Sequence, residues 1–150
     1  MRLVLAGMLY LHSKMVAHRD FKSLNVLIFH INNQLVAKIT DFGISKDNSP
    51  GNTAVKKTQT LSAPIGTPAW SAPEVLRQTA NLDAYAADVW SFGVVVWEVV
   101  TCEMPWADCS VLATMNEVGN RNRAPTMPAD APKEVARLFQ SCCVKDPRQR

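Results

Sequence analysis

The chain lacks three features that would assign it to common classes of protein: a CxxC pair, a secretory signal and an apolar run long enough to cross a bilayer. Its four cysteines have no CxxC spacing, and residues 1–11 lack the long apolar core and small-residue cleavage site of a signal peptide. The longest apolar stretch, VWSFGVVVWEVV at residues 89–100, is shorter than the ~20 residues of a membrane span and contains Glu98. We therefore expect a buried helix there, no transmembrane segment, and reduced thiols in an intracellular, cytoplasmic protein.

The chain also lacks a stripe of basic residues, although it is weakly positive. Sixteen Lys plus Arg against thirteen Asp plus Glu give +3, and the basic residues are scattered apart from short pairs such as Lys56-Lys57 and Arg121 with Arg123. This distribution argues against a nucleic-acid partner. With 150 residues, 47% of them hydrophobic, the chain fits one domain with a real core. No internal repeat or linker divides it.

The first forty residues predict a helix followed by a β-hairpin. Residues 1–13 carry apolar side chains at helical spacing, although no capping residue begins this helix. Residues 26–29 and 35–39 are short apolar runs that we expect to form strands, the first of them buried. The sequence INNQ separates them, and Asn32 and Asn33 tolerate the positive φ of a tight hairpin turn.

The rest of the chain predicts one long loop and then mainly helices. Residues 47–68 are rich in Ser, Thr, Pro, Gly and Asn with little periodicity, as in exposed functional loops. The dipeptide Pro73-Glu74 suits the first turn of a helix. Asp88 is a candidate cap for the buried helix through Val100, and residues 132–144 are amphipathic.

Polar and charged side chains crowd the stretch HRDFKSLN, residues 18–25, directly before the first predicted strand. If the hairpin turn is centred on the two asparagines, Asn25 faces Thr40 across the strands. Asp41 directly follows Thr40, so it lies beside Asn25. A carboxylate and an amide oxygen at one open hairpin end suit a Mg²⁺ that takes its other ligands from water and phosphates. Asp20 and Lys22 lie in the turn that leads into the same hairpin. The convergence of these four groups favours phosphoryl transfer.

Four motifs, in this order, resemble those of a eukaryotic protein kinase: HRDFKSLN, DFG at residues 41–43, APE at residues 72–74 and DVWSFG at residues 88–93. The resemblance covers the whole chain. GTPAWSAPE and the tail CCVKDPRQR are most similar to the tyrosine-kinase-like group, which includes Raf and the mixed-lineage kinases and mostly phosphorylates Ser and Thr. The resemblance implies a protein kinase-like α+β fold, mainly α-helical with short β-hairpins at the active site. Residues 1–150 would form its large C-terminal lobe.

The resemblance implies catalytic roles for several of these residues. Asp20 resembles the catalytic aspartate that accepts the proton of the substrate hydroxyl, a role typically worth ~10²- to 10⁴-fold in rate. Lys22 resembles the lysine that neutralises the γ-phosphate in serine/threonine kinases, and Thr67 resembles the threonine that bridges the two. Together they favour protein substrates with Ser or Thr acceptors without excluding tyrosine. The alternatives are a turn-forming Asp20 and a solvated Lys22.

The same resemblance implies ATP and Mg²⁺ as cofactors. Asn25, which also belongs to the catalytic set, and Asp41 would bind both the metal and the nucleotide it carries. The alternative is that each only forms a turn. Leu27 resembles the residue that packs beneath the adenine of ATP, although packing into the core is a compatible role for it.

Five residues resemble structural positions of the family. His18 and Phe42 resemble members of its regulatory hydrophobic stack, and Asp88 resembles the anchor that holds the backbone near His18. Glu74 and Arg150 resemble the ion pair that ties the end of the activation segment to the helical base. If that pair is buried, deleting one partner costs about 3 to 5 kcal/mol.

The segment between DFG and APE resembles the activation segment of the family. It contains four hydroxyl residues that are candidate phosphorylation sites: Thr53, Thr58, Thr60 and Ser62. Arg19 and Lys46 resemble the basic pocket that pairs with such a phosphate and orders the loop. The alternative for Arg19 is local packing and pairing.

A kinase also needs a Gly-rich loop over the phosphates and a strand lysine paired with a helix glutamate, and this chain contains neither. The sequence VAKI at residues 36–39 follows HRD, so Lys38 cannot be that lysine and should face solvent. We therefore expect a partial kinase domain without the small lobe and the last helix, which binds ATP weakly and transfers phosphate slowly or not at all. The alternative function is a truncated or pseudokinase-like regulatory or binding module without catalysis.

Overall fold

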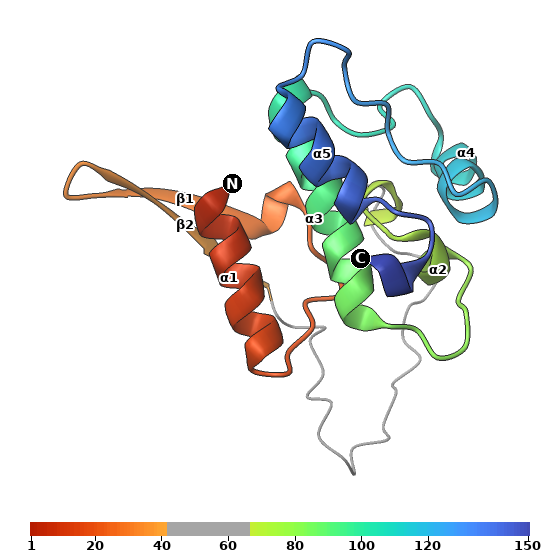
Figure 1. Ribbon diagram of the computed structural model, residues 1–150, viewed down its shortest axis with the longest axis horizontal. Helices are drawn as coiled ribbons and strands as arrows, with labels where there is room; N and C mark the ends of the chain where they lie inside the picture. Colours follow the sequence, from red (N-terminus) through yellow and green to blue (C-terminus); the bar gives the residue numbers. More distant parts are fainter. Residues whose placement is uncertain (42–66) are drawn as a thin grey trace.

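The computed structural model describes residues 1–41 and 67–150, which form a helical body and one β-hairpin (Figure 1). In chain order the elements are α1 (Arg2–Ser13), η1 (Ser23–Asn25), β1 (Val26–Ile31), β2 (Gln34–Ile39), η3 (Thr67–Ala69), α2 (Pro73–Leu76), α3 (Ala84–Thr101), α4 (Val111–Met115), η4 (Asn116–Asn120), α5 (Lys133–Cys142) and η5 (Pro147–Gln149). Three of the short elements, η1, η3 and η5, are 3-10 turns, whereas η4 is a π-helical turn. The helices predicted at both ends of the chain are therefore present.

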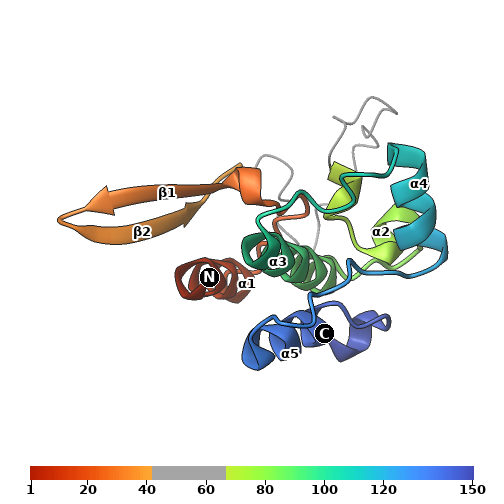
Figure 2. The same ribbon diagram turned by 90° about the horizontal axis from the view of Figure 1, so that it is seen from above.

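Helix α3 forms the centre of the helical body, with α1 and α5 beside it (Figure 2). Most of its residues are apolar and buried, as expected for a helix surrounded by protein, and Trp90, Val94 and Val96 are among its most deeply buried side chains. Phe139 and Cys142 of α5 enter the same core. The buried helix predicted from the long apolar stretch is confirmed. None of the described helices has the length and apolar character needed to cross a membrane.

The N-terminus of α3 is capped by Asp83, so the cap predicted at Asp88 is wrong. Asp83 Oδ1 accepts hydrogen bonds from the backbone N–H groups of Tyr85 at 3.0 Å and Ala86 at 3.1 Å. The helix begins at Ala84 because the alanine-rich turn before the apolar run already favours helix. Asp88 consequently lies inside the helix, with its carboxylate buried.

The hairpin forms as predicted. Strands β1 and β2 pair antiparallel, with Val26 opposite Ile39. Asn32 and Asn33 make a two-residue turn with φ of 50° and 59°, in the left-handed region that such turns require and that Asn tolerates. Lys38 is exposed, as expected for a strand lysine that faces solvent.

Strand β1 is exposed, so the prediction that a buried strand begins after the polar cluster is wrong. Every residue from Leu27 to Ile31 is exposed, and Figures 1 and 2 show the hairpin projecting from the helical body. Only the base of the hairpin, at Val26, Ala37 and Ile39, packs against the core. A two-stranded sheet that touches the body at its base leaves its outer apolar side chains at the surface.

The four cysteines are free thiols, as predicted. Cys142 and Cys143 lie at the end of α5, where it meets α3. Burial raises the pKa of both thiols, and the neighbouring Cys142 raises the pKa of Cys143 further. Both therefore stay protonated at neutral pH, the form that does not react as a nucleophile.

We expect Gly93→Ala to destabilise the fold, because α5 approaches α3 closely at this glycine. A Cβ on residue 93 would lie 2.6 Å from Cβ of Cys142 and 2.7 Å from Sγ of Cys143. Overpacking of this kind should lower the free energy of unfolding by about 1 to 3 kcal/mol, measured by urea denaturation. Gly7→Ala is the matched control, since its Cβ would meet only the flexible end of Ile39, at 3.0 Å. Equal losses in the two variants would contradict the tight contact between α3 and α5.

Candidate active site

The loop before β1 is held by one buried carboxylate on α3. Asp88 Oδ2 accepts a hydrogen bond from the backbone N–H of His18 at 2.7 Å, and Oδ1 accepts one from the backbone N–H of Arg19, also at 2.7 Å. Nε2 of His12, on α1, lies 3.0 Å from the same Oδ2. The Asp88 side chain is 1% exposed, and a buried carboxylate requires such donors. Asp88 thus fixes the backbone directly before Asp20.

The side chain of His18 ties this loop to the end of β2. Its ring is fully buried, and Nε2 lies 2.9 Å from the carbonyl oxygen of Thr40. The ring packs edge-on against Phe21, with 5.5 Å between ring centroids, and Phe21 stacks on Phe92 of α3. Arg19, between His18 and Asp20, has a φ of 69°, which a non-glycine residue adopts at a cost in free energy. The surrounding contacts hold the loop in this shape.

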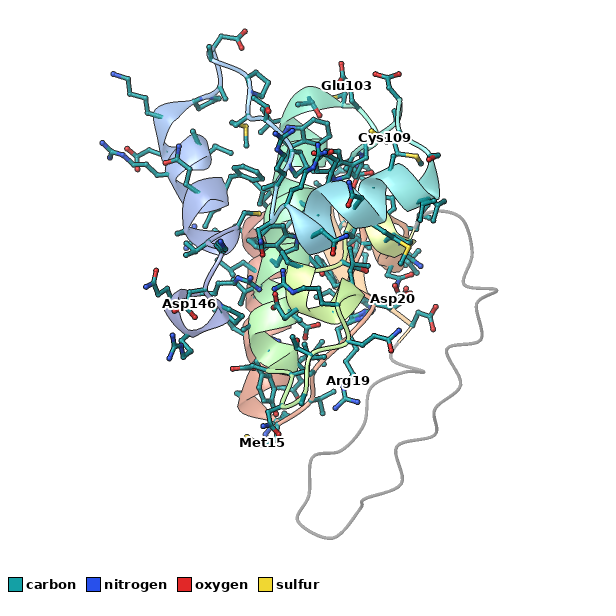
Figure 3. The ribbon with its side chains drawn as sticks, turned by 90° about the vertical axis from the view of Figure 1, so that its right-hand side faces the viewer. Met15, Arg19, Asp20, Glu103, Cys109 and Asp146 are labelled. Atoms are coloured by element: carbon teal, nitrogen blue, oxygen red, sulfur yellow. The ribbon has the colours of Figure 1, made fainter. Side chains whose placement is uncertain are left out.

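Asp20, Lys22 and Asn25 are brought together by the same loop. Lys22 Nζ donates to Asp20 Oδ2 at 2.8 Å, and Asn25 Nδ2 donates to the backbone carbonyl of Asp20 at 2.8 Å. Asn25 is buried, whereas the Asp20 carboxylate is partly exposed. Figure 3 shows Arg19 and Asp20 next to each other on one side of the molecule, away from Asp146. On this side, 15% of the Asp20 side chain is exposed.

The residues proposed to hold a metal lie at the open end of the hairpin. The backbone N–H of Thr40 donates to the carbonyl of Asn25 at 2.9 Å, which is the pairing expected from the turn position. Asp41 follows directly, exposed and with a φ of 63°. Because Asn25 uses its Nδ2 to bind Asp20, its amide oxygen remains for a cation. One amide oxygen and one carboxylate fit a Mg²⁺ that keeps water and phosphate ligands. Within the described ranges, no three His, Cys, Asp or Glu side chains gather as a complete metal cage.

Glu98 is a contact residue of this site that the sequence did not reveal. Its Oε1 accepts a hydrogen bond from Ser23 Oγ at 2.7 Å, and its Oε2 accepts one from Trp70 Nε1 at 3.0 Å. Ser23 lies between Lys22 and Asn25, and buried Trp70 directly follows η3. From the sequence, Glu98 served only as an argument against a membrane span. An acid within the long apolar stretch at residues 89–100 is the signal that could have identified it, since such a charge needs donors.

Glu74 and Arg150 form a buried ion pair with two hydrogen bonds, from Arg150 Nη1 to Glu74 Oε1 at 2.6 Å and from Nη2 to Oε2 at 3.1 Å. The Arg150 side chain is 0% exposed and Glu74 6%. The guanidinium also lies over the ring of Trp90 and donates to the carbonyl of Val144. The pair links α2 to the end of the chain, and removing one partner would strand the other charge.

Several predicted residues lie outside the described part of the chain: Phe42, Lys46, Thr53, Thr58, Thr60 and Ser62. Thr67 begins η3, and only its backbone is described. Leu27 is 44% exposed in the projecting hairpin, so the expectation that it could also pack into the core is wrong. Because its side chain is exposed, Leu27 can still contact a ligand.

Comparison with known proteins matches the whole chain to one family. The family described as protein tyrosine and serine/threonine kinase matches residues 1–150. Mitogen-activated protein kinase kinase kinase 10 of Homo sapiens is 39% identical over 98% of this chain and 15% of its own length. Mitogen-activated protein kinase kinase kinase A of Dictyostelium discoideum is 34% identical over 98% of this chain and 14% of its own length. Mitogen-activated protein kinase kinase kinase 12 of Rattus norvegicus is 37% identical over 98% of this chain and 15% of its own length. The chain thus spans about 15% of the length of these relatives.

We expect Glu98→Gln to loosen the loop that carries Lys22, because two neutral donors would lose a charged acceptor. The free energy of unfolding should fall by about 1 to 3 kcal/mol, measured by urea denaturation. A double-mutant cycle with Ser23→Ala should show a coupling energy of about 0.5 kcal/mol or more. Glu103→Gln, at an exposed acid just after α3, is the control. Zero coupling between positions 98 and 23 would rule out the bridge.

Proposed function

Since this chain belongs to the protein tyrosine and serine/threonine kinase family, we propose that it carries the catalytic groups of a serine/threonine protein kinase. Its reaction is transfer of the γ-phosphate of ATP to Ser or Thr hydroxyls of proteins. The observation that carries this proposal is the loop at residues 18–25, in which Lys22 pairs with the partly exposed carboxylate of Asp20 and Asn25 binds the backbone of Asp20. These groups are the ones that phosphoryl transfer uses at one centre.

The two oxygens of Asp20 would have separate tasks in this reaction. Oδ2 holds Lys22 at 2.8 Å, whereas Oδ1 makes no hydrogen bond to any described residue. Oδ1 is therefore left to accept the substrate hydroxyl and to take its proton as the new bond to phosphorus forms. Lys22, held at the other oxygen, places a positive charge beside the phosphate that moves.

Asn25 and Asp41 are the residues that would bind Mg²⁺ on ATP. The hydrogen bond from Asn25 Nδ2 to the loop fixes which way its amide points, and Asp41 follows the strand residue paired with Asn25. A Mg²⁺ held by these residues would neutralise part of the phosphate charge of ATP. The role of these two residues is to set where the nucleotide phosphates lie relative to Asp20.

The chain would form the large C-terminal lobe of the kinase domain. Support comes from the apolar side chains that α1 and the hairpin leave exposed. They are Leu3, Leu5, Leu9 and Tyr10 on α1 and Leu27, Ile28, Phe29 and Leu35 on the hairpin. Large apolar side chains left exposed on neighbouring elements favour a contact with other protein, which in this proposal is the small lobe that completes the ATP site.

A regulatory or binding module without catalysis is the second candidate. The same exposed apolar side chains favour it, because they would bind protein whether or not phosphate is transferred. The presence of Asp20, Lys22, Asn25 and Asp41 together argues for the enzyme, because a module that only binds needs none of these groups.

We expect phosphate transfer to require a small lobe. The isolated 150-residue chain with Mg²⁺ and ATP should transfer little or no phosphate, because ATP would be held from one side. Fusion behind the small lobe of a related kinase should give transfer to Ser and Thr of a protein substrate. In that fusion Asp20→Asn should lower the rate ~10²- to 10⁴-fold, measured with radiolabelled ATP.

Lys38→Ala, at a solvent-facing strand lysine, is the control in the same fusion and should leave the rate unchanged. Robust turnover by the isolated chain would overturn the proposed lobe assignment but not the proposed function. Full activity of the Asp20→Asn fusion would overturn the function itself.

We also propose that phosphorylation of the segment between DFG and APE raises activity. The support is Arg19, which Asp88 holds beside Asp20 and which could pair with an added phosphate. Replacing the four hydroxyl residues Thr53, Thr58, Thr60 and Ser62 by alanine in the fusion should lower its rate. Ser141→Ala, at an exposed hydroxyl on α5, is the control. Unchanged activity of the fourfold variant would remove this hypothesis.

A further inference from the structure

A pocket of about 580 Å³ lies between α2, α4 and η4. Its volume is within the range of ligand-binding pockets, roughly 300 to 1,000 Å³. None of its lining residues belongs to the candidate active site: the lining includes Leu76, Arg77, Leu112, Met115 and Gly119. This pocket is therefore a feature of the molecule that the proposed reaction does not use.

The floor of the pocket is held by contacts between α2 and the π-helical turn η4. Arg77 Nη1 donates to the carbonyl of Gly119 at 2.6 Å and to Asn122 Oδ1 at 2.7 Å. A Cβ on Gly119 would lie 3.2 Å from Cβ of Leu76, so the glycine lets the two elements approach closely. Single π-helical turns within helices occur frequently at functional sites. These contacts between α2 and η4 hold the shape of the pocket.

Apolar side chains from two elements gather at the pocket. Leu112 of α4 lines it yet is 77% exposed, and Met115 is exposed as well. Leu76 of α2 lines it from the other element. A single exposed leucine needs no explanation, but three apolar side chains around one pocket form a site for an apolar side chain of another molecule.

The charge on the lining of the pocket comes from Arg77, while the other polar lining residues, Ser110, Asn116 and Asn120, are neutral. Arg77 forms no ion pair with any described carboxylate, and its known hydrogen bonds go to neutral oxygens. Arg121 and Arg123, just after η4 and outside the lining, both pair with Glu117, at 2.6 and 3.0 Å. The positive charge of Arg77 therefore favours an anionic group in the occupant.

We propose that this pocket docks an acidic, leucine-containing segment of a partner protein. A leucine-sized side chain of the partner packs among Leu76, Leu112 and Met115, and a carboxylate of the partner pairs with Arg77. The combination of apolar contacts with an arginine that lacks an acid fits a peptide better than a free anion, which would leave the apolar wall uncovered. Docking needs neither ATP nor Asp20, so it can be tested apart from phosphate transfer.

The probe is a short fluorescein-labelled peptide of leucine and glutamate residues, added to the 150-residue chain and followed by fluorescence anisotropy. We expect saturable binding that Arg77→Ala weakens at least about tenfold and Leu112→Ala at least about fivefold, as for residues central to an interface. Arg137→Ala, at an exposed arginine on α5, is the matched control and should not change the affinity. Replacing glutamate by lysine or leucine by alanine in the peptide should abolish binding.

Folding of each variant is checked by circular dichroism and thermal unfolding. Arg77→Ala also removes contacts to Gly119 and Asn122, so if it does not fold, Leu112→Ala decides, since that side chain is largely exposed. Absence of peptide binding up to millimolar concentration overturns the proposal, as does equal binding by both variants. A DNA oligonucleotide that binds as tightly as the peptide, or self-association of the chain through this pocket in sedimentation, also overturns it.

Discussion

The candidate site depends on the buried carboxylate of Asp88. This one group accepts hydrogen bonds from two successive backbone N–H groups of the loop, at His18 and Arg19, and lies beside His12 of α1. Withdrawing a carboxylate from water is costly unless such donors replace the lost hydration, so helix α3, helix α1 and the loop stabilise one another. The loop takes a shape with a positive φ at Arg19, and the next residue, Asp20, emerges at the surface beside Lys22. The buried carboxylate of Asp88 thereby determines where Asp20 lies.

The features that could be predicted from the sequence are those set by local chemistry. Two adjacent asparagines between apolar runs determine a two-residue turn, and that turn fixes the pairing of Asn25 with Thr40 by counting outwards from its centre. The polar cluster, read against the family motifs, identified Asp20, Lys22 and Asn25, and the structure brings all three together. The central helix followed from the length and apolar character of its stretch.

The features that could not be predicted arise between segments far apart in the chain. Ser23 and Glu98 are 75 residues apart, and no local pattern links them. The cap of α3 was predicted wrongly because the helix begins at Ala84, before the apolar run, so that Asp83 is the cap and Asp88 lies inside the helix. The apolar sequence of β1 predicts a buried strand, but whether the strand is buried depends on which other elements cover it. The pocket at Arg77 likewise combines three elements whose sequences carry no shared motif.

The two acids of α3 that hold the site, Asp88 and Glu98, are ten positions apart on one continuous helix. A helix rises about 1.5 Å and turns about 100° per residue, so these anchors stand roughly 15 Å apart with a fixed angular offset. One residue inserted between them would rotate Glu98 by about 100° away from Ser23 and Trp70 while Asp88 kept its partners. Extra residues at the hairpin tip would disturb neither attachment. The number of residues between the two acids is therefore constrained, because any change in the length of this stretch of α3 would break one of the two attachments.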